Sequence, residues 1–153
     1  ELILKLKEKI PDIALTADVI VGFPGETNED FEETMDLIQK VKFDGIFSFI
    51  YSKRTGTPAA EMEQVLSKQE IQRNFNRLTE TQQEIGYLKN LEYLDKNCEI
   101  LVESKSKSNE NMLSGRTRTG KIIHFEGDES LIGEFAWVKI TKVQTYYMLG
   151  EKV

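Results

Sequence analysis

The stretch that most constrains the fold runs from Asp18 to Thr27 and reads Asp-Val-Ile-Val-Gly-Phe-Pro-Gly-Glu-Thr. The apolar run at 19–21 is typical of a strand covered on both faces, as in a parallel sheet. Gly22, Pro24 and Gly25 then predict a sharp turn. In parallel α/β folds such a strand-to-helix turn lies at the carboxyl end of the strands, where ligands bind.

A helix is expected to begin directly after this turn. Thr27 and Asp30 have the spacing of a capping box, and Phe31 and Met35 begin an apolar stripe at helical intervals. A second apolar strand follows at residues 45–51. A strand, a helix and a strand at this spacing predict a βαβ unit with two parallel strands.

A parallel sheet of two strands cannot cover its own faces. Residues 1 to about 60 are therefore expected to be a slice of a larger barrel or doubly wound sheet. Residues 1–10 carry apolar side chains near helical spacing without a preceding N-cap, which suggests that the chain starts inside a helix. The exposed sheet also predicts self-association of the chain, as a homo-oligomer or by exchange of strands between copies.

The second half of the chain has a different pattern. Ser67 and Glu70 form another capping box and open a long helix that is expected to connect two domains. From Asn97 onward, short apolar runs separated by turn residues predict a small antiparallel barrel of the OB kind. The candidate strands are residues 98–103, 113–117, 121–125, 135–143 and 146–151.

The charge is also divided unequally along the chain. The formal net charge is −6. Residues 1–95 contribute 11 Lys and Arg against 18 Asp and Glu, whereas residues 96–153 contribute 9 against 8. Because RNA affinity depends largely on neutralising phosphates, the basic cluster within residues 104–124 predicts RNA binding; its alternative interpretation is a solvated basic face.

Alternation along residues 135–141 places Phe135, Trp137 and Lys139 on one face of a strand. An aromatic ring beside a lysine can stack an RNA base, although Trp137 can equally pack against a neighbouring side chain. Tyr146 and Tyr147 are expected to be one core and one surface residue of the last strand.

Cysteine and histidine are scarce. Cys98 and His124 are single in the chain, so it has no internal disulfide framework and too few ligands for a zinc or iron–sulfur site. His124 has no acid or nucleophile beside it in the sequence and is not expected to be catalytic. No apolar stretch approaches a membrane span, and a reducing, cytoplasmic location without a membrane partner is the simplest expectation.

Three motifs now resemble those of a known family. They are Val-Gly-Phe-Pro-Gly-Glu-Thr at 21–27, Tyr-Ser-Lys-Arg-Thr-Gly-Thr-Pro-Ala-Ala at 51–60 and Leu-Ser-Gly-Arg-Thr at 113–117. In this order they are similar to the radical S-adenosylmethionine (SAM) methylthiotransferases, and the resemblance covers essentially the whole chain. It implies an α/β plus all-β architecture: the end of a TIM-like radical SAM barrel at 1–66, a connecting helix at 67–95, and a five-stranded TRAM barrel at 96–153.

The resemblance also suggests a substrate. The Lys-Arg pair after Tyr51-Ser52 and the segment 109–117 are most similar to the member that methylthiolates isopentenyladenosine beside the tRNA anticodon. Relatives that act on threonylcarbamoyladenosine in tRNA, or on an aspartate of a ribosomal protein, remain alternatives. A different class of function is a stand-alone RNA-binding adaptor whose βαβ segment docks another protein.

Members of this family use SAM and two 4Fe-4S clusters, held by a CxxxCxxC motif and by three cysteines of an N-terminal domain. Neither cysteine set is present here. The resemblance therefore implies tRNA and the missing N-terminal part of the same enzyme as partners. No catalytic residue, no metal ligand and no bound cofactor are expected in this chain alone, which should be inactive without that part.

The resemblance assigns site residues by position. Asp18, Ile20, Gly22 and Glu26 fall on the GxIxGxxE pattern of many radical SAM proteins, with Asp18 in place of the first glycine. The strand is thereby expected to line the SAM pocket; the alternative is that the glycines only shape a turn and Glu26 caps a helix. The expected cofactor-binding residues are Asp18, Ile20, Gly22, Glu26, Tyr51, Ser52 and Arg54.

A phosphate-binding loop is a further interpretation of this turn. It is disfavoured because the turn lacks the Gly-Lys-Ser/Thr sequence that holds phosphates and magnesium. Arg54 is expected to bind a cofactor carboxylate or a tRNA phosphate, or else to pair with a surface carboxylate. The expected RNA-binding residues are Lys105, Lys107, Arg116, Arg118, Lys121, Trp137 and Lys139.

Overall fold

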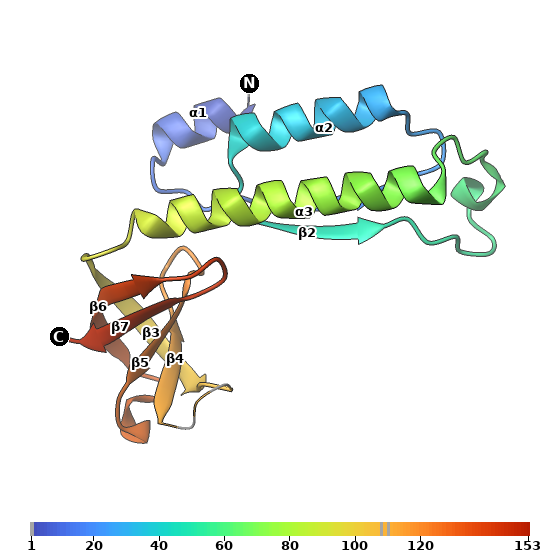
Figure 1. The fold of residues 1–153 in the computed structure, drawn as a ribbon. Helices are drawn as coiled ribbons and strands as arrows, with labels where there is room; N and C mark the ends of the chain where they lie inside the picture. Colours follow the sequence, from blue (N-terminus) through green and yellow to red (C-terminus); the bar gives the residue numbers. More distant parts are fainter. Residues whose placement is uncertain (1, 108, 110) are drawn as a thin grey trace. The chain divides into compact units, whose positions relative to one another are not determined.

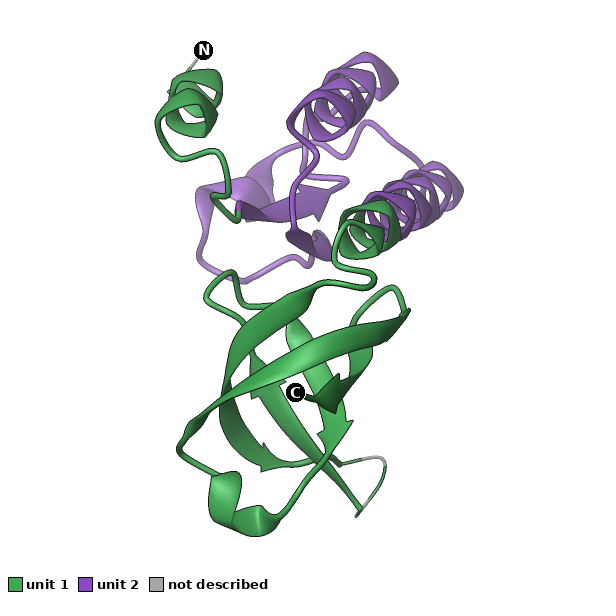
Figure 2. Ribbon diagram, turned by 90° about the vertical axis from the view of Figure 1, so that its left-hand side faces the viewer, with its two compact units in different colours: residues 1–14, 86–153 green, residues 15–85 purple. Residues whose placement is uncertain are grey.

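The computed structural model describes residues 2–107, 109 and 111–153, which form two compact units (Figures 1 and 2). Residues 15–85 make up the α/β unit, and residues 1–14 with 86–153 make up the barrel unit. The boundary falls inside helix α3 (Lys68–Leu91). In the described part of the chain, no helix combines the length and the apolar character needed to cross a membrane.

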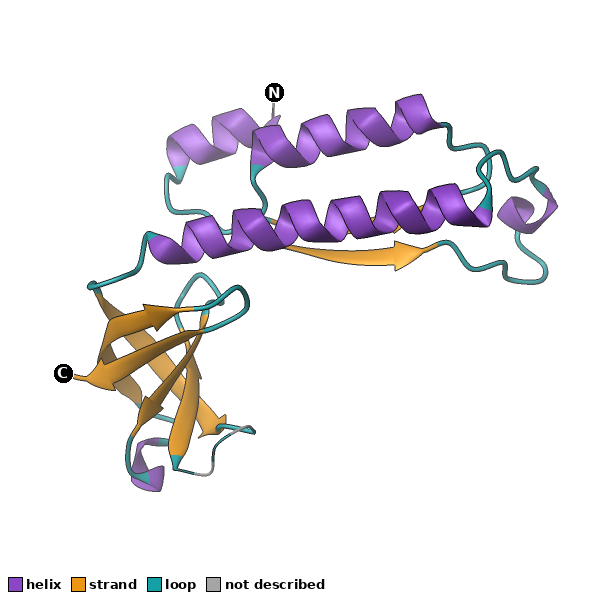
Figure 3. Cartoon of the chain, in the orientation of Figure 1, coloured by secondary structure: helices purple, strands orange, loops and turns teal. Residues whose placement is uncertain are grey.

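The α/β unit is built around one parallel strand pair (Figure 3). The two strands pair in a regular parallel register, which confirms the predicted βαβ unit. Besides α3, its elements are β1 (Thr16–Val21), α2 (Asn28–Val41), β2 (Gly45–Ile50) and the short 3-10 helix η1 (Pro58–Glu61).

Both predicted capping boxes are confirmed. At the start of α2 the Asp30 N–H donates to Thr27 Oγ1 over 3.2 Å, and the Thr27 N–H donates to Asp30 Oδ2 over 2.9 Å. Ser67 and Glu70 make the same reciprocal pair at the start of α3. Helix α2 ends at Lys42, whose φ of 53° is left-handed. These helix starts are local in origin, since a few neighbouring residues satisfy the free N–H groups of the first turn.

The two faces of the β1–β2 sheet differ in their cover. Helices α2 and α3 lie side by side on one face (Figures 2 and 3), where Val21, Phe31, Met35, Ile38 and Leu78 are buried. The opposite face carries Ile20, Phe47 and Phe49, which are 49%, 64% and 54% exposed. The open face agrees with the expectation that a two-stranded parallel sheet cannot cover its own faces, because the described residues of the α/β unit cover the sheet from one side only.

The barrel unit contains a closed five-stranded barrel with the order β3-β4-β5-β7-β6. All neighbouring pairs are antiparallel except β5 and β7, which are parallel. A five-stranded closed barrel of this kind is the OB architecture predicted from the strand spacing. Its strands are β3 (Asn97–Lys105), β4 (Met112–Arg116), β5 (Ile122–Glu126), β6 (Phe135–Val143) and β7 (Met148–Lys152), and the 3-10 helix η2 (Glu129–Leu131) precedes β6.

The alternation predicted along β6 is confirmed. Ala136, Val138 and Ile140 are buried in the barrel core, whereas Phe135 and Trp137 are exposed. The core is completed by Val143 at the end of β6 and, from the other strands, by Ile100, Val102, Leu113, Ile123, Phe125 and Met148.

Helix α1 and the β6–β7 loop both expose side chains that were candidates for burial. Helix α1 (Leu2–Lys9) forms as expected, but none of its described residues is buried. Tyr146 and Tyr147 were predicted as one core and one surface residue of a strand, and this is wrong. Both lie in the β6–β7 loop and are 69% and 38% exposed, because Gln144 N–H donates to Tyr147 O and turns the chain before β7 begins.

Candidate functional site

The turn after β1 is held in a conformation that requires glycine. Gly22 is buried with a φ of +72°, and a Cβ built on it would lie 2.7 Å from the side chain of Ile71 in α3. Its N–H donates to the carboxylate of Glu26. Burial raises the pKa of Glu26, the Gly22 hydrogen bond lowers it, and the nearby charge of Asp30 raises it again, so the net shift is upward. Glu26 therefore closes the turn and does not cap α2.

The loop that follows β2 contacts this turn. Tyr51 N–H donates to Val21 O over 2.9 Å, and the rings of Phe23 and Tyr51 pack edge to face with centroids 5.2 Å apart. The Tyr51 hydroxyl is buried and has no hydrogen-bond partner among the described residues. The carboxyl ends of β1 and β2 thus form one joint surface.

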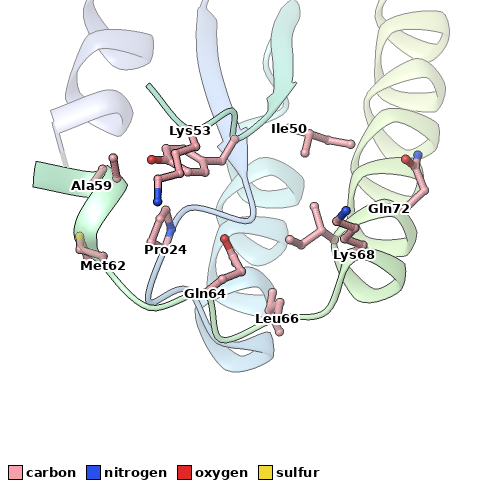
Figure 4. Close-up of a pocket in the computed structure, with 12 residues that line it drawn as sticks. Pro24, Ile50, Lys53, Ala59, Met62, Gln64, Leu66, Lys68 and Gln72 are labelled. Atoms are coloured by element: carbon pink, nitrogen blue, oxygen red, sulfur yellow. The ribbon is translucent and has the colours of Figure 1, made fainter. Parts of the chain in front are cut away.

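A cavity of about 520 Å³ opens at this edge of the α/β unit (Figure 4). Pro24 and Tyr51 line it from the two loops, and Lys53, Gln64 and Lys68 supply polar groups around it. Its remaining lining, mostly apolar, consists of Ile50, Ala59, Ala60, Met62, Leu66, Ile71 and Gln72. Of the seven expected cofactor-binding residues, only Tyr51 lines this cavity.

The other six lie elsewhere on the α/β unit. Asp18 and Ile20 are on the exposed face of the sheet, directly opposite Phe47 and Phe49. Gly22 and Glu26 form the turn described above. Ser52 and Arg54 are exposed in the loop after β2, and the Arg54 carbonyl accepts hydrogen bonds from the N–H and the hydroxyl of Thr57. The expected residues therefore occupy one sheet edge and one adjoining face rather than a single enclosed pocket.

Three of the expected RNA-binding cations form exposed ion pairs on the barrel unit. The pairs are Lys105 with Glu129, Arg116 with Glu103, and Arg118 with Glu99. The Arg116 and Arg118 contacts measure 3.0 and 3.6 Å from Nε to the carboxylate. The local positive charge is thus more evenly compensated than the residue count of this segment suggests.

The remaining expected RNA-binding residues are spread over the barrel surface. Lys107 is exposed and Lys121 is partly buried. Trp137 is 52% exposed and lies opposite Glu99 of β3. Lys139 is exposed on the same side of β6. Glu110, which belongs to the segment 109–117 used for the resemblance, lies outside the described residues.

Metal and thiol chemistry find little support in these residues. No group of three or more His, Cys, Asp or Glu among the described residues is placed to hold a metal ion. Burial raises the pKa of the Cys98 thiol, and burial lowers the pKa of His124. The chain therefore does not fit an iron–sulfur cluster, which needs several cysteines.

Phe47 and Phe49 were not predicted as part of a site. Their spacing of two residues in a short apolar strand does place them on one face, but whether that face is covered depends on residues far away in the sequence. Phe135 was recognised as facing outward, and at 65% exposure it is the most open aromatic ring of β6.

Comparison with known proteins shows what the two units are similar to. The family description of the TRAM domain matches residues 92–153, which include all five barrel strands. The chain is 51% identical over 152 residues, 99% of its length, to the tRNA-2-methylthio-N(6)-dimethylallyladenosine synthase of Acetivibrio thermocellus. It is 48% identical over 153 residues, 100% of its length, to the synthase of the same name from Clostridium botulinum.

A third synthase of this name, from Natranaerobius thermophilus, is 48% identical over 151 residues, 99% of the chain. The matched segments cover 32%, 34% and 34% of the three relatives, so the chain spans about a third of their length. Residues 92–153 match the TRAM domain, and the whole chain is similar, at about half of its residues, to about one third of the length of the tRNA-2-methylthio-N(6)-dimethylallyladenosine synthases.

Proposed function

We propose that this chain is the C-terminal part of a radical SAM tRNA methylthiotransferase, which adds a methylthio group to isopentenyladenosine next to the anticodon. The observation that carries the proposal is the identity of about half of all residues with the named synthases along the whole chain. In this assignment residues 1–66 are the end of the radical SAM barrel, residues 67–95 are the connecting helix and residues 96–153 are the RNA-binding barrel.

The exposed sheet face supports the first of these assignments. Ile20, Phe47 and Phe49 are large apolar side chains left open to solvent on one face of a parallel pair, and parallel sheets are normally covered on both faces. In the complete enzyme this face would look into the barrel. Ile20 and the two phenylalanines would then pack against the adenine of SAM, and Asp18 would face its polar groups.

The complete enzyme would bind SAM and two 4Fe-4S clusters, which supply the hydrogen-abstracting and sulfur-transfer chemistry. The cysteines that hold those clusters would lie outside this chain, because Cys98 is its single cysteine. The contribution of this chain is to form part of the SAM pocket at the turn of Gly22 and Glu26 and in the loop from Tyr51 to Arg54. By itself it would be inactive, and as part of a tRNA-modifying enzyme it would work in the cytoplasm.

Two alternatives share some of this support. The relatives acting on threonylcarbamoyladenosine or on a ribosomal-protein aspartate would use the same two units, but the names of the compared synthases favour dimethylallyladenosine. A non-enzymatic RNA-binding adaptor would use the open sheet face to dock a protein. Restoration of SAM cleavage when the N-terminal part of the enzyme is supplied is expected under the main proposal and not for an adaptor.

Binding of tRNA tests the role of the barrel unit. Replacing Arg116, Arg118 and Lys121 together by Ala is expected to weaken binding of an unmodified tRNA, because each lost phosphate contact reduces the slope of log affinity against log salt by about 1. A matched control with the same loss of charge replaces Lys9, Lys40 and Arg73, which are exposed on helices. Equal salt slopes for both triple variants and the unaltered chain would remove the basic cluster from the site.

A further inference from the structure

The β6–β7 loop is fixed in place by a buried side chain. Asn90, 4% exposed at the end of α3, donates from Nδ2 to Gln144 O over 2.9 Å and to Thr145 O over 3.1 Å. Gly86, one helical turn earlier, brings its Cα close to the same loop, since a Cβ there would lie 3.6 Å from Thr145 O. The loop carbonyls are thus bound by the helix, and the following residues are held in a defined position.

The two residues that this loop presents are aromatic. Tyr146 is 69% exposed, and Tyr147 is 38% exposed. The Tyr147 ring packs edge to face on His124 of β5, with centroids 5.2 Å apart and an interplanar angle of 65°. The Tyr146 ring therefore stands in solvent. The Tyr147 ring is supported by an imidazole and loses little freedom when a flat ligand binds.

The surface beside this loop belongs to the second and third strands of the barrel. The strand registers place Ser114, His124, Leu149 and Lys142 in one row across β4, β5, β7 and β6. In OB barrels, the face of the second and third strands and the loop between the fourth and fifth strands bind oligonucleotides. Here those strands are β4 and β5, and that loop is residues 144–147. Lys142 adds an exposed cation to the row.

We propose that Tyr146, Tyr147 and His124 form a stacking surface for unpaired bases of an RNA. The proposal rests on the proposed function and deepens it, because it locates the bases at the β6–β7 loop and β5 and not at Phe135 and Trp137. Aromatic rings bind bases of any sequence through their faces, and the neighbouring lysine meets the backbone. Asn90 acts as a positioning residue by holding the loop.

The test uses the 153-residue chain and two RNA probes: a hairpin with 2-aminopurine in its unpaired loop, and a continuous duplex of the same length. Tyr146→Leu and Tyr147→Leu are each expected to weaken hairpin binding by about tenfold, the loss typical of one stacked base. They are also expected to reduce the change in 2-aminopurine fluorescence on binding. Tyr146→Phe and Tyr147→Phe, which keep the ring, should bind the hairpin within about twofold of the unaltered chain.

The matched control is Phe135→Leu, which removes an equally exposed ring from β6. It should leave hairpin binding unchanged, and all variants should bind the duplex alike. Hairpin binding that is insensitive to both leucine variants, or that is lost only with Phe135→Leu, would overturn the stacking surface while leaving RNA binding itself intact. Failure of the unaltered chain to bind either RNA would overturn both this surface and the RNA-binding role in the proposed function.

Discussion

Gly22 is the residue on which the β1–α2 turn depends most. Replacing it by Ala adds a side chain at a φ of +72° and places Cβ 2.7 Å from Ile71, so both backbone strain and overpacking oppose folding. We expect Gly22→Ala to lower the free energy of unfolding of the α/β unit by about 2–4 kcal/mol. The helical circular dichroism signal during denaturant titration measures the change.

Gly56 provides a control for the two contributions. Its φ of +83° is also left-handed, but nothing lies within 4 Å of a Cβ built there. Gly56→Ala should therefore cost only the backbone term of about 1 kcal/mol. Equal losses in the two variants would show that the approach of Ile71 to Gly22 does not matter.

Glu26 gives the turn a pH dependence. Because its folded pKa is raised above the ordinary value of 4.5, mainly by burial, its ionisation costs stability as the pH rises through that folded value. Glu26→Gln removes the charge and keeps an acceptor for the Gly22 N–H. The variant should therefore be more stable than the unaltered chain at neutral pH, and the two should converge in acid. Denaturant titrations across this pH range give the comparison, and lower stability of the variant at neutral pH would contradict the assigned shift.

Residues whose roles depend on near neighbours were predictable. Thr27 with Asp30, and Ser67 with Glu70, form their capping boxes as the sequence spacing indicates. The pairing of Arg116 with Glu103 was not predictable, since it depends on the register of β3 and β4 and on the bulge between Val102 and Ser104. The cofactor and RNA contacts remain predictions.

At the scale of elements, the β1–β2 sheet is the most informative. Periodicity in the sequence was enough to predict two parallel strands with a helix between them, because that pattern is local. The exposure of Ile20 agrees with the expectation that two strands cannot cover both faces, but the residues that would cover the second face could not be predicted from these strands. Likewise the alternation of buried and exposed residues on β6 was predicted correctly. The start of the last strand was predicted at residue 146, two residues before β7 begins at Met148.

The open sheet face predicts self-association of this chain. Phe47 and Phe49 are 64% and 54% exposed beside Ile20, and burying them between two copies removes apolar surface from water. Sedimentation velocity should therefore show a concentration-dependent oligomer. Phe47→Thr combined with Phe49→Thr should shift it toward monomer, whereas Phe135→Thr on the barrel should not. A monomer at all concentrations before any substitution would contradict the prediction.

At the scale of the whole molecule, the structure divides into the α/β unit of residues 15–85 and the barrel unit of residues 1–14 and 86–153. The expected segments 1–66, 67–95 and 96–153 remain a prediction. The TRAM domain at residues 92–153 begins within the predicted connecting helix, four residues before the boundary expected from strand spacing. The modified nucleoside could not be predicted from the fold, because residues outside this chain would form most of the catalytic pocket. The similarity to the named synthases is what favours dimethylallyladenosine.

The most direct test of the account is to supply the N-terminal part that the proposed function requires. Co-expression of that part as a separate polypeptide, followed by cluster reconstitution, should give an assembly that cleaves SAM and forms methylthiolated dimethylallyladenosine in tRNA, both measured by mass spectrometry. Each part alone should give neither product. A stable assembly with loaded clusters that still lacks both activities, or an N-terminal part that is fully active without this chain, would contradict the claim that the open sheet completes the enzyme's barrel.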